Sequence, residues 1–174
     1  DDHTTKKMGT TAGMDRHEAI TKMKELGEGK VCMFLTSMDQ RPIPSRPMAV
    51  QKVCDKGNFW FLSSRTSAKD QQLRQDPQVQ LMFADTSNAE YMSVLGTAEE
   101  IDSMEKKKEL WSSMAKAWFP DGVEDPDLTV IKVTTTGAHY WDTKHGKLVS
   151  MIKILGAAVT GNPADIGVEG TIKL

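Results

Sequence analysis

Five hydroxyl or cationic residues near the middle of the chain have the chemistry of an anion site. They are Ser63, Ser64, Arg65, Ser67 and Lys69. Such residues can bind a phosphate when they lie at the start of a helix, because its first N–H groups are unpaired and carry partial positive charge. The alternative is an ordinary capped surface helix, since every helix start offers the same N–H groups.

The flanking residues predict the elements that would hold this site. Residues 59–62 are aromatic and apolar, and turn residues precede them at 56–58, which predicts a buried strand entered from a tight turn. Ser67 and Asp70 form a capping-box-like pair for a helix over 68–75 that ends before Pro77. We expect residues 45–50 to pair with the strand through a hairpin. Arg46 could then add a bidentate contact to the same anion.

Length, charge and cysteine content limit the class of protein. A chain of 174 residues can bury the core of one domain, and a formal net charge of −2 does not indicate a nucleic-acid partner. Cys32 and Cys54 favour reduced thiols over a secreted disulfide framework. The four histidines have no metal-ligand spacing, so we assign no metal site. The absence of a long apolar run or signal-peptide core predicts a soluble cytoplasmic protein without a membrane partner.

The first part of the chain predicts a tail, a helix and two strands. Residues 1–13 are polar and lack periodicity, so we expect a disordered tail and a single domain over 14–174. Asp15 can cap a helix that ends at Gly27. Residues 31–35 are apolar on both sides, which predicts a strand buried on both faces or one at a barrel closure. The prolines within residues 42–47 predict that the returning strand, 43–52, is irregular or lies at an unpaired border.

The second part predicts three more strands and two helices. Strands are expected at 78–84, at 91–101 with a bulge or close approach at Gly96, and at 128–142. A long helix is expected from residue 102 or 103, with one apolar stripe consisting of Leu110, Trp111, Met114 and Trp118. Residues 147–160 have helical apolar spacing. Six strands joined mostly by short turns predict a mainly β, α+β fold, an antiparallel barrel flanked by helices.

The order of these segments resembles the pyridoxamine 5'-phosphate oxidase-like, FMN-binding split-barrel superfamily, and more closely its general stress protein 26 branch. Six stretches in the family's order, between about residues 33 and 142, carry the resemblance. They are 45–48 (Ser-Arg-Pro-Met), 59–65 with Ser67 and Lys69, 76–79 (Asp-Pro-Gln-Val), 94–99, 116–120 (Lys-Ala-Trp-Phe-Pro) and 140–142 (Tyr-Trp-Asp).

The resemblance implies a six-stranded split barrel and a homodimer in which both subunits build each FMN site. It places Arg46, Pro47 and Met48 against the flavin and its phosphate. Leu62 and Ser63 correspond to a pair that contacts the ring or ribityl chain, and Ser67 and Lys69 to the phosphate-binding helix start, beside Ser64. Trp141 corresponds to a tryptophan that approaches the flavin from the partner subunit.

Departures from the oxidase argue against oxidation of vitamin B6. Ala68 stands where the oxidase has an arginine, so one phosphate contact is missing and Arg65 could replace it. Tyr91 stands at the position of a flavin-contacting glutamine. Residues 144–147 (Lys-His-Gly-Lys) replace the run that binds the vitamin.

The resemblance therefore implies an FMN-dependent oxidoreductase that acts with an unidentified small-molecule redox partner, and no catalytic side chain is assigned. One alternative is a protein that stores or senses FMN without turnover. Another is a haem- or deazaflavin-binding relative on the same barrel, because a fold does not determine function. A DNA-binding module is least favoured, because the sequence has no basic helix.

Overall fold

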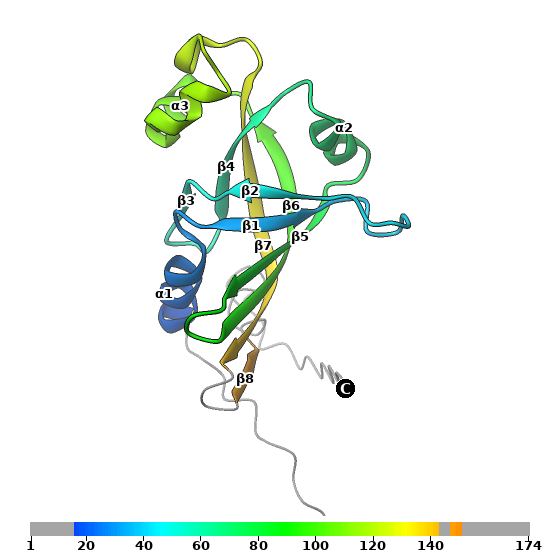
Figure 1. Ribbon diagram of the computed structural model, residues 1–174, viewed down its shortest axis with the longest axis vertical. Helices are drawn as coiled ribbons and strands as arrows, with labels where there is room; N and C mark the ends of the chain where they lie inside the picture. Colours follow the sequence, from blue (N-terminus) through cyan, green and yellow to red (C-terminus); the bar gives the residue numbers. More distant parts are fainter. Residues whose placement is uncertain (1–15, 143–146, 151–174) are drawn as a thin grey trace, which may run out of the picture.

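The computed structural model describes residues 16–142 and 147–150, which form an antiparallel sheet with helices (Figure 1). The strands are β1 (Val31–Leu35), β2 (Ser45–Ala49), β3 (Lys52–Val53), β4 (Phe59–Ser64), β5 (Gln78–Asp85), β6 (Glu90–Ile101), β7 (Leu128–Asp142) and β8 (Lys147–Ser150). The helices are α1 (Arg16–Gly27), α2 (Ala68–Gln75), α3 (Met104–Leu110) and the short 3-10 turns η1 (Ser113–Ala117) and η2 (Gly122–Glu124).

The sheet is an antiparallel half-barrel, so the predicted α+β class is confirmed. Its strands follow the order β2-β1-β5-β6-β7-β4-β3, and β8 pairs with β7. The prediction of six strands was too low, because it included neither the two-residue β3 nor β8.

Several predictions lie outside the described residues. They concern the tail at 1–13, the cap Asp15, residues 144–146, and the part of the expected helix beyond residue 150.

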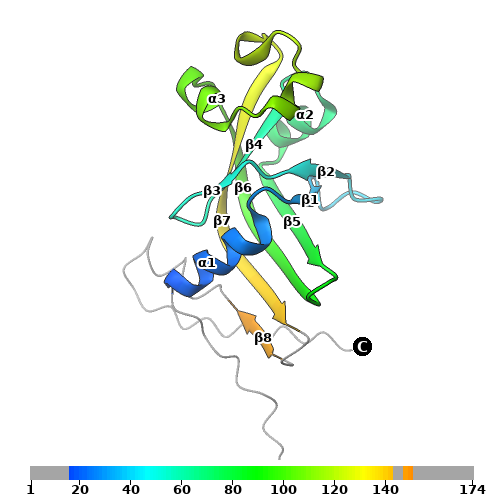
Figure 2. The ribbon, with the colours of Figure 1, turned by 60° about the vertical axis from the view of Figure 1, so that its left-hand side comes forward.

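The helices divide the sheet into two ends. Figure 1 shows α2 and α3 together at one end, whereas the β5–β6 turn and β8 lie at the other. Figure 2 shows the same separation after a turn of the molecule. α1 packs against β3, β5 and β6.

Aromatic side chains fill the main core on the inner face of the sheet. Phe34 of β1 and Phe61 of β4 meet edge to face, with ring centroids 5.2 Å apart. Phe59 lies 5.5 Å from Phe83. Cys32 also lies in this core, where burial raises the pKa of its thiol to about 12, and both cysteines are free thiols. The predicted buried strand at 59–62 is confirmed, and its tight turn contains Gly57 at a φ of 77°.

β1 is buried on one face only, which corrects the expectation of burial on both. Cys32 and Phe34 are buried, but 64% of Val31 and 40% of Met33 are exposed. The outward side chains are apolar, yet no described helix or strand of the same chain covers them.

β2 pairs with β1, and not with β4 as the sequence suggested. Arg46 lies opposite Phe34 of β1, whereas β4 forms its hairpin with the short β3. The chain changes partner at residues 50–51. It pairs with β1 as far as the end of β2 and begins to pair with β4 at β3. The prediction of a border strand is confirmed, since β2 is the first strand of the sheet.

The long helix predicted from residue 102 or 103 is also corrected. Ser103 does cap α3, but the helix ends at Leu110 because Trp111 has an extended backbone, with ψ at 135°. The chain restarts as η1, so the apolar stripe does not continue. As a result Phe119 is buried, while Met114 and Trp118 are each 82% exposed.

Gly96 causes a bulge in β6, as predicted. The β6–β7 register shifts between Leu95 and Gly96. A Cβ atom at position 96 would lie 2.6 Å from Val133 Cγ1 and 2.7 Å from the Thr134 carbonyl oxygen. Close approach of β7 therefore requires glycine here.

Residues 147–150 form β8 and not the start of a helix. Lys147 pairs with Asp142, and Ser150 with His139. Since β4 pairs with β7 only as far as Val133, the later part of β7 has an edge that β8 can occupy.

Candidate functional site

The start of α2 is built as the sequence predicted. Ser67 is the N-cap, and its hydroxyl accepts a hydrogen bond from the Asp70 backbone N–H at 3.3 Å. The helix ends at Gln75, before Asp76 and Pro77. Leu73 is the only large apolar residue of α2, so polar side chains must occupy the rest of its inner face. Lys69 and Asp70 lie four and three residues before Leu73 and are buried with it.

Lys69 is a buried cation, with 2% of the residue exposed. Its ammonium donates to the Ser63 hydroxyl and to Asp70 Oδ1. The same Oδ1 atom accepts from Ser63 Oγ at 2.7 Å and from Ser67 Oγ at 2.9 Å. Ser63, Ser67 and Lys69 are therefore brought together around one carboxylate.

Arg46 reaches the same region from β2. Its Nη2 donates to Gln72 Oε1 at 3.3 Å, and Thr36 Oγ1 donates to the same oxygen at 2.5 Å. Arg46 Nε is buried and has no hydrogen-bond partner. The guanidinium thus has a donor left over for another acceptor.

The two cations influence each other. Burial lowers the pKa of Lys69, the hydrogen bond to Asp70 opposes this effect, and the charge of Arg46 lowers the pKa further. An anion placed between the two would relieve this repulsion.

Ser64 and Arg65 face a different set of partners. Ser64 Oγ donates to Asp127 Oδ2 at 2.5 Å, and Arg65 Nη2 lies 3.4 Å from the Leu128 carbonyl and 3.7 Å from Asp102 Oδ1. Successive residues of β4 point to opposite faces, so Ser63 faces the core while Ser64 does not. The structure does not bring Ser64 or Arg65 together with Lys69.

Three apolar residues predicted to belong to the site, Pro47, Met48 and Leu62, lie in three different environments. Met48 packs against the main core, beside Arg46 on β2. Pro47 is exposed on the opposite face, where it pairs with Met33. Leu62 packs under α3 and η1, with the two smaller clusters of the core.

Tyr91 and Trp141 lie at the other end of the sheet. They are direct partners in the β6–β7 ladder, 40% and 37% exposed. Along β6, Glu100 is nine positions from Tyr91, and it contacts Arg74 of α2. At about 3.3 Å per residue this is a span of roughly 30 Å. Within one chain, Trp141 is therefore remote from Lys69.

A sequence model of the "Pyridoxamine 5'-phosphate oxidase like" family matches residues 18–165. The chain belongs to this family. Among curated proteins it is similar to protein bli-3 of Neurospora crassa, with 27% identity over 144 residues, covering 76% of this chain and 69% of bli-3.

Solved structures share the fold of this family member. A protein from Clostridium acetobutylicum related to general stress protein 26 superposes with a TM-score of 0.66 at 22% identity, covering 79% of this chain and 95% of that one. The general stress FMN/FAD binding protein of Xanthomonas citri gives a TM-score of 0.61 at 24% identity, covering 70% of this chain and 86% of that one. The predicted resemblance to the oxidase-like family is thus confirmed, and relatives of general stress protein 26 share its fold.

Sequence reasoning missed three polar residues that support the site in this oxidase-like chain. Gln72 accepts hydrogen bonds from Arg46 and Thr36, and Glu100 of β6 accepts one from Arg74 of α2 at 2.8 Å. The small number of apolar residues in α2 was a signal that Gln72 could have an inward role. Glu100 gave no local signal, because β6 is far from α2 in sequence.

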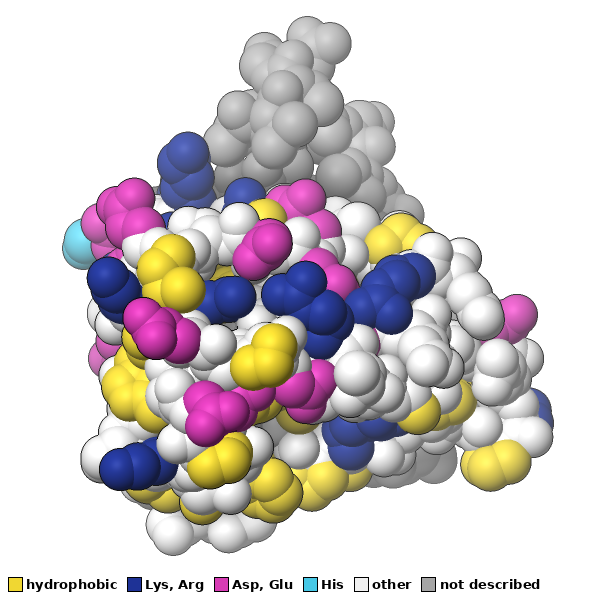
Figure 3. Space-filling model, turned by 90° about the horizontal axis from the view of Figure 1, so that it is seen from above, with side chains coloured by type: hydrophobic (Ala, Val, Ile, Leu, Met, Phe, Trp, Pro, Cys, Tyr) yellow, Lys and Arg dark blue, Asp and Glu magenta, His cyan; other side chains and the backbone are white. Residues whose placement is uncertain are grey.

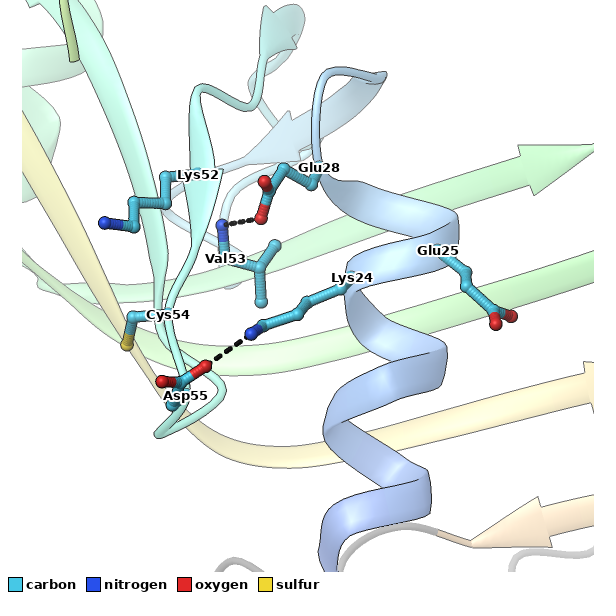
Figure 4. Close-up of a pocket in the computed structure, with 7 residues that line it drawn as sticks. All are labelled: Lys24, Glu25, Glu28, Lys52, Val53, Cys54 and Asp55. Carbon is cyan, nitrogen blue, oxygen red and sulfur yellow. Dashed lines mark hydrogen bonds and ion pairs between the residues drawn. The ribbon is translucent and has the colours of Figure 1, made fainter.

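A separate cavity of about 530 Å³ lies between α1 and the β3–β4 hairpin (Figure 4). Lys24 and Asp55 form an ion pair there, and Glu28 Oε2 accepts the Val53 N–H at 3.0 Å. None of the predicted site residues lines this cavity. The polar groups that line this cavity mostly bond to one another, so the start of α2 is the better candidate for the functional site.

The surface at the α2 and α3 end carries charges of both signs. Figure 3 shows Lys and Arg side chains interspersed with Asp and Glu on this face. In the described ranges no helix is long and apolar enough to span a membrane. The same ranges contain no group of three or more His, Cys, Asp or Glu residues placed to hold a metal ion.

Proposed function

We propose that this chain binds FMN, with the flavin phosphate held between Lys69 and Arg46. The observation that carries the proposal is the sheltered pair of cations at the start of α2, in which Arg46 Nε has no partner. The Xanthomonas citri relative is named as an FMN/FAD binding protein, which supports a flavin for this chain as well.

The residues present fit a phosphate. A dianion can accept hydrogen bonds from guanidinium and ammonium groups together, and such charge-assisted bonds are the strong ones. Lys69 also comes from the first turn of α2, where the helix dipole favours an anion. Ser63 and Asp70 orient the ammonium and so prepare the site.

We further propose that the active form is a homodimer and that each site includes the partner's Trp141. Trp141 and Lys69 are too far apart in one chain to contact the same flavin. The outer face of the sheet supports association, because exposed apolar side chains run across β1, β5, β6 and β7. They are Val31, Met33, Met82, Tyr91, Leu95 and Trp141.

The reaction we propose is electron or hydride transfer between FMN and small-molecule donors and acceptors. A bound flavin supplies that chemistry itself, so the protein has to hold and orient it and control access to it. This proposal needs no catalytic side chain. A protein that binds FMN but shows no reduction by NADH or NADPH, and no transfer to an acceptor, would instead favour storage or sensing.

The test is a titration of the purified protein with FMN and with riboflavin, which lacks the phosphate. Arg46→Ala combined with Lys69→Ala should weaken FMN binding by about 3 to 6 kcal/mol, at about 1.5 to 3 kcal/mol for each charge-assisted bond. Riboflavin binding should change little. Because Lys69→Ala leaves Asp70 buried without its cation, the single variant Arg46→Ala serves as the milder test.

Lys108→Ala combined with Lys116→Ala is the matched control, because both lysines are exposed and the charge change is the same. Its FMN affinity should equal that of the wild type. The proposal is contradicted if the Arg46 and Lys69 variants bind FMN as tightly as the control. A Soret band in the absorbance spectrum, in place of flavin bands, would identify a haem protein.

A further inference from the structure

Lys107 of α3 is a second buried cation, outside the Lys69 site. It lies three residues before Leu110 and faces the sheet with it, so only 7% of the residue is exposed. An ammonium group has three N–H donors. Among the described residues this one has a single acceptor, Asp102 Oδ1, at 3.4 Å. Since a buried charge is costly unless it is well paired, Lys107 has room for a further anionic partner.

Arg65 directs its guanidinium group at the same carboxylate. It comes from the turn between β4 and α2, and its Nη2 lies 3.7 Å from Asp102 Oδ1. Nη2 also donates to the Leu128 carbonyl at 3.4 Å, a long hydrogen bond, and Nε is buried without a partner. Nε and Nη2 form one edge of the planar group, and such an edge can hold two oxygens of an oxyanion. Arg65 therefore has a bidentate edge that the described residues do not fill.

Asp102 links the two cations but is a weak partner for both. Charge-assisted hydrogen bonds are normally about 2.7 to 2.9 Å long, and both of its contacts are longer. Its side chain is 75% exposed, so a dissolved anion can displace it. Asp127 also lies near Arg65, but its side chain accepts hydrogen bonds from two hydroxyl groups instead.

The pair of Arg65 and Lys107 is separate from the Lys69 site, although Figure 1 shows α2 and α3 at the same end of the sheet. Ser63 and Lys69 meet on the core side of β4. Arg65 and Lys107 instead meet beside α3, through Asp102, and their two nitrogens lie no further apart than the sum of its two contacts. An anion held here is therefore not the anion held by Lys69.

We propose that Arg65 and Lys107 form a second oxyanion site, which takes the phosphate group of a small molecule other than FMN, and that Asp102 occupies this site until the ligand arrives. Two phosphate oxygens then lie along the Nε and Nη2 edge of Arg65, and a third accepts from Lys107. A phosphate suits the pair better than a carboxylate, because a carboxylate has only two oxygens to share between the cations. The inference goes beyond the proposed function and does not depend on it.

The test adds inorganic phosphate, adenosine 5'-phosphate or adenosine to the FMN-saturated protein, in which the first anion site is filled. Proton–nitrogen NMR spectra follow the Nε–H signal of Arg65, which is identified by its loss in Arg65→Met. Both phosphates should shift this signal, and adenosine should not. Tighter binding of the nucleotide would identify a nucleotide as the source of the phosphate, whereas equal binding would mean that the phosphate group alone is recognised. A signal that neither phosphate moves would overturn the proposal.

Two variants should change the affinity for inorganic phosphate in opposite directions. Lys107→Met keeps the length of the side chain and removes its charge, so binding should weaken about tenfold. Asp102→Asn removes the competing charge, so binding should tighten about three- to tenfold. Lys108→Met and Glu105→Gln are the matched controls, because both residues are exposed on the same helix, and they should bind phosphate as the wild type does.

An unchanged affinity in Lys107→Met, or an affinity that Asp102→Asn does not raise, would overturn the proposal. Urea unfolding checks the fold of each variant. If Lys107→Met does not fold, the exposed Asp102→Asn decides the question alone. A protein that does not bind FMN would contradict the proposed function, and the same phosphate titration of Arg46→Ala, in which the first site is weakened, would still test Arg65 and Lys107.

Discussion

Lys69 shows how one residue can be both buried and charged. Moving an ammonium out of water is expensive, and removal of its partner would leave an uncompensated charge. Here Asp70 supplies the opposite charge and Ser63 a further hydrogen bond, so the ammonium is held in place before any anion arrives. Arg46 depends in a similar way on Gln72.

Gln72→Leu tests this second support at the residue scale. The substitution removes the acceptor for Arg46 Nη2 and leaves the buried Thr36 hydroxyl without its partner. We expect the free energy of unfolding to fall by about 1 to 3 kcal/mol, the usual cost of an unsatisfied buried polar group. Urea denaturation measures it. Gln71→Leu, on the exposed side of the same helix, should stay within about 0.5 kcal/mol of the wild type.

Asp127 connects two elements that are distant in the sequence. It lies just before β7 and accepts hydrogen bonds from Ser64 Oγ, Thr66 Oγ1 and the Thr66 N–H in the turn between β4 and α2. The bond from Ser64 makes the largest contribution to lowering the pKa of Asp127, burial opposes it, and the bonds from Thr66 lower the pKa further. The carboxylate thus ties the start of α2 to the sheet.

This tie predicts a pH dependence. An acid whose pKa is lower in the folded state stabilises the fold above its unfolded pKa of about 3.9, and this stabilisation is lost as the pH falls through the folded pKa. Asp127→Asn should therefore unfold at lower urea than the wild type at pH 7, and the difference should shrink below about pH 4. A difference that stays constant with pH would contradict the assignment, and the exposed Asp121→Asn is the control.

The elements predicted well are those with local signals. The strand at 59–62 and the helix over 68–75 were found because aromatic residues, a turn glycine, a capping serine and a proline mark them within a few residues. Gly96 was recognised for the same reason. In contrast, the pairing of β2 with β1 and the contact of Glu100 with Arg74 join distant parts of the chain.

One error had a signal that was available. The alternation of β4, which separates Ser63 from Ser64, could likewise be read from its period of two. The stripe through Met114 and Trp118 assumed an unbroken helix, but the strand-favouring Trp111 and two serines interrupt it. Residues 147–160 have helical apolar spacing, yet residues 147–150 form a strand because they pair with the free edge of β7.

The region after α3 gives an element-scale prediction. Phe119 is buried with Ala115 and Leu128, whereas the adjacent Trp118 is exposed. Phe119→Ala should lower the free energy of unfolding by about 3 to 5 kcal/mol, while Trp118→Ala should change it by no more than about 0.5 kcal/mol. Thermal or urea unfolding distinguishes the two. Equal losses would contradict the burial of Phe119 and the exposure of Trp118.

At the scale of the whole molecule, the outer face of the sheet is an apolar surface that the described elements of the same chain do not cover. Met82 pairs with Met33 across β5 and β1, and Leu95 lies on the same face of β6. Monomeric proteins seldom expose an apolar surface that runs across several strands, and a stable dimer covers about 800 Å² on each partner. The proposed shared site requires that this association bring the partner's Trp141 to the Lys69 end of the first chain.

Charged substitutions on this face should separate the subunits, because a lysine placed in an apolar interface loses its hydration without gaining a partner. We expect Met82→Lys combined with Leu95→Lys to sediment as a monomer where the wild type is a dimer, and to bind FMN more weakly because no partner's Trp141 completes the site. Met114→Lys combined with Trp118→Lys places the same charges on residues that are even more exposed, at the opposite end. That control should remain dimeric with unchanged FMN affinity, whereas a monomeric wild type, or a dimer that survives the Met82 and Leu95 substitutions, would contradict a site shared between two chains.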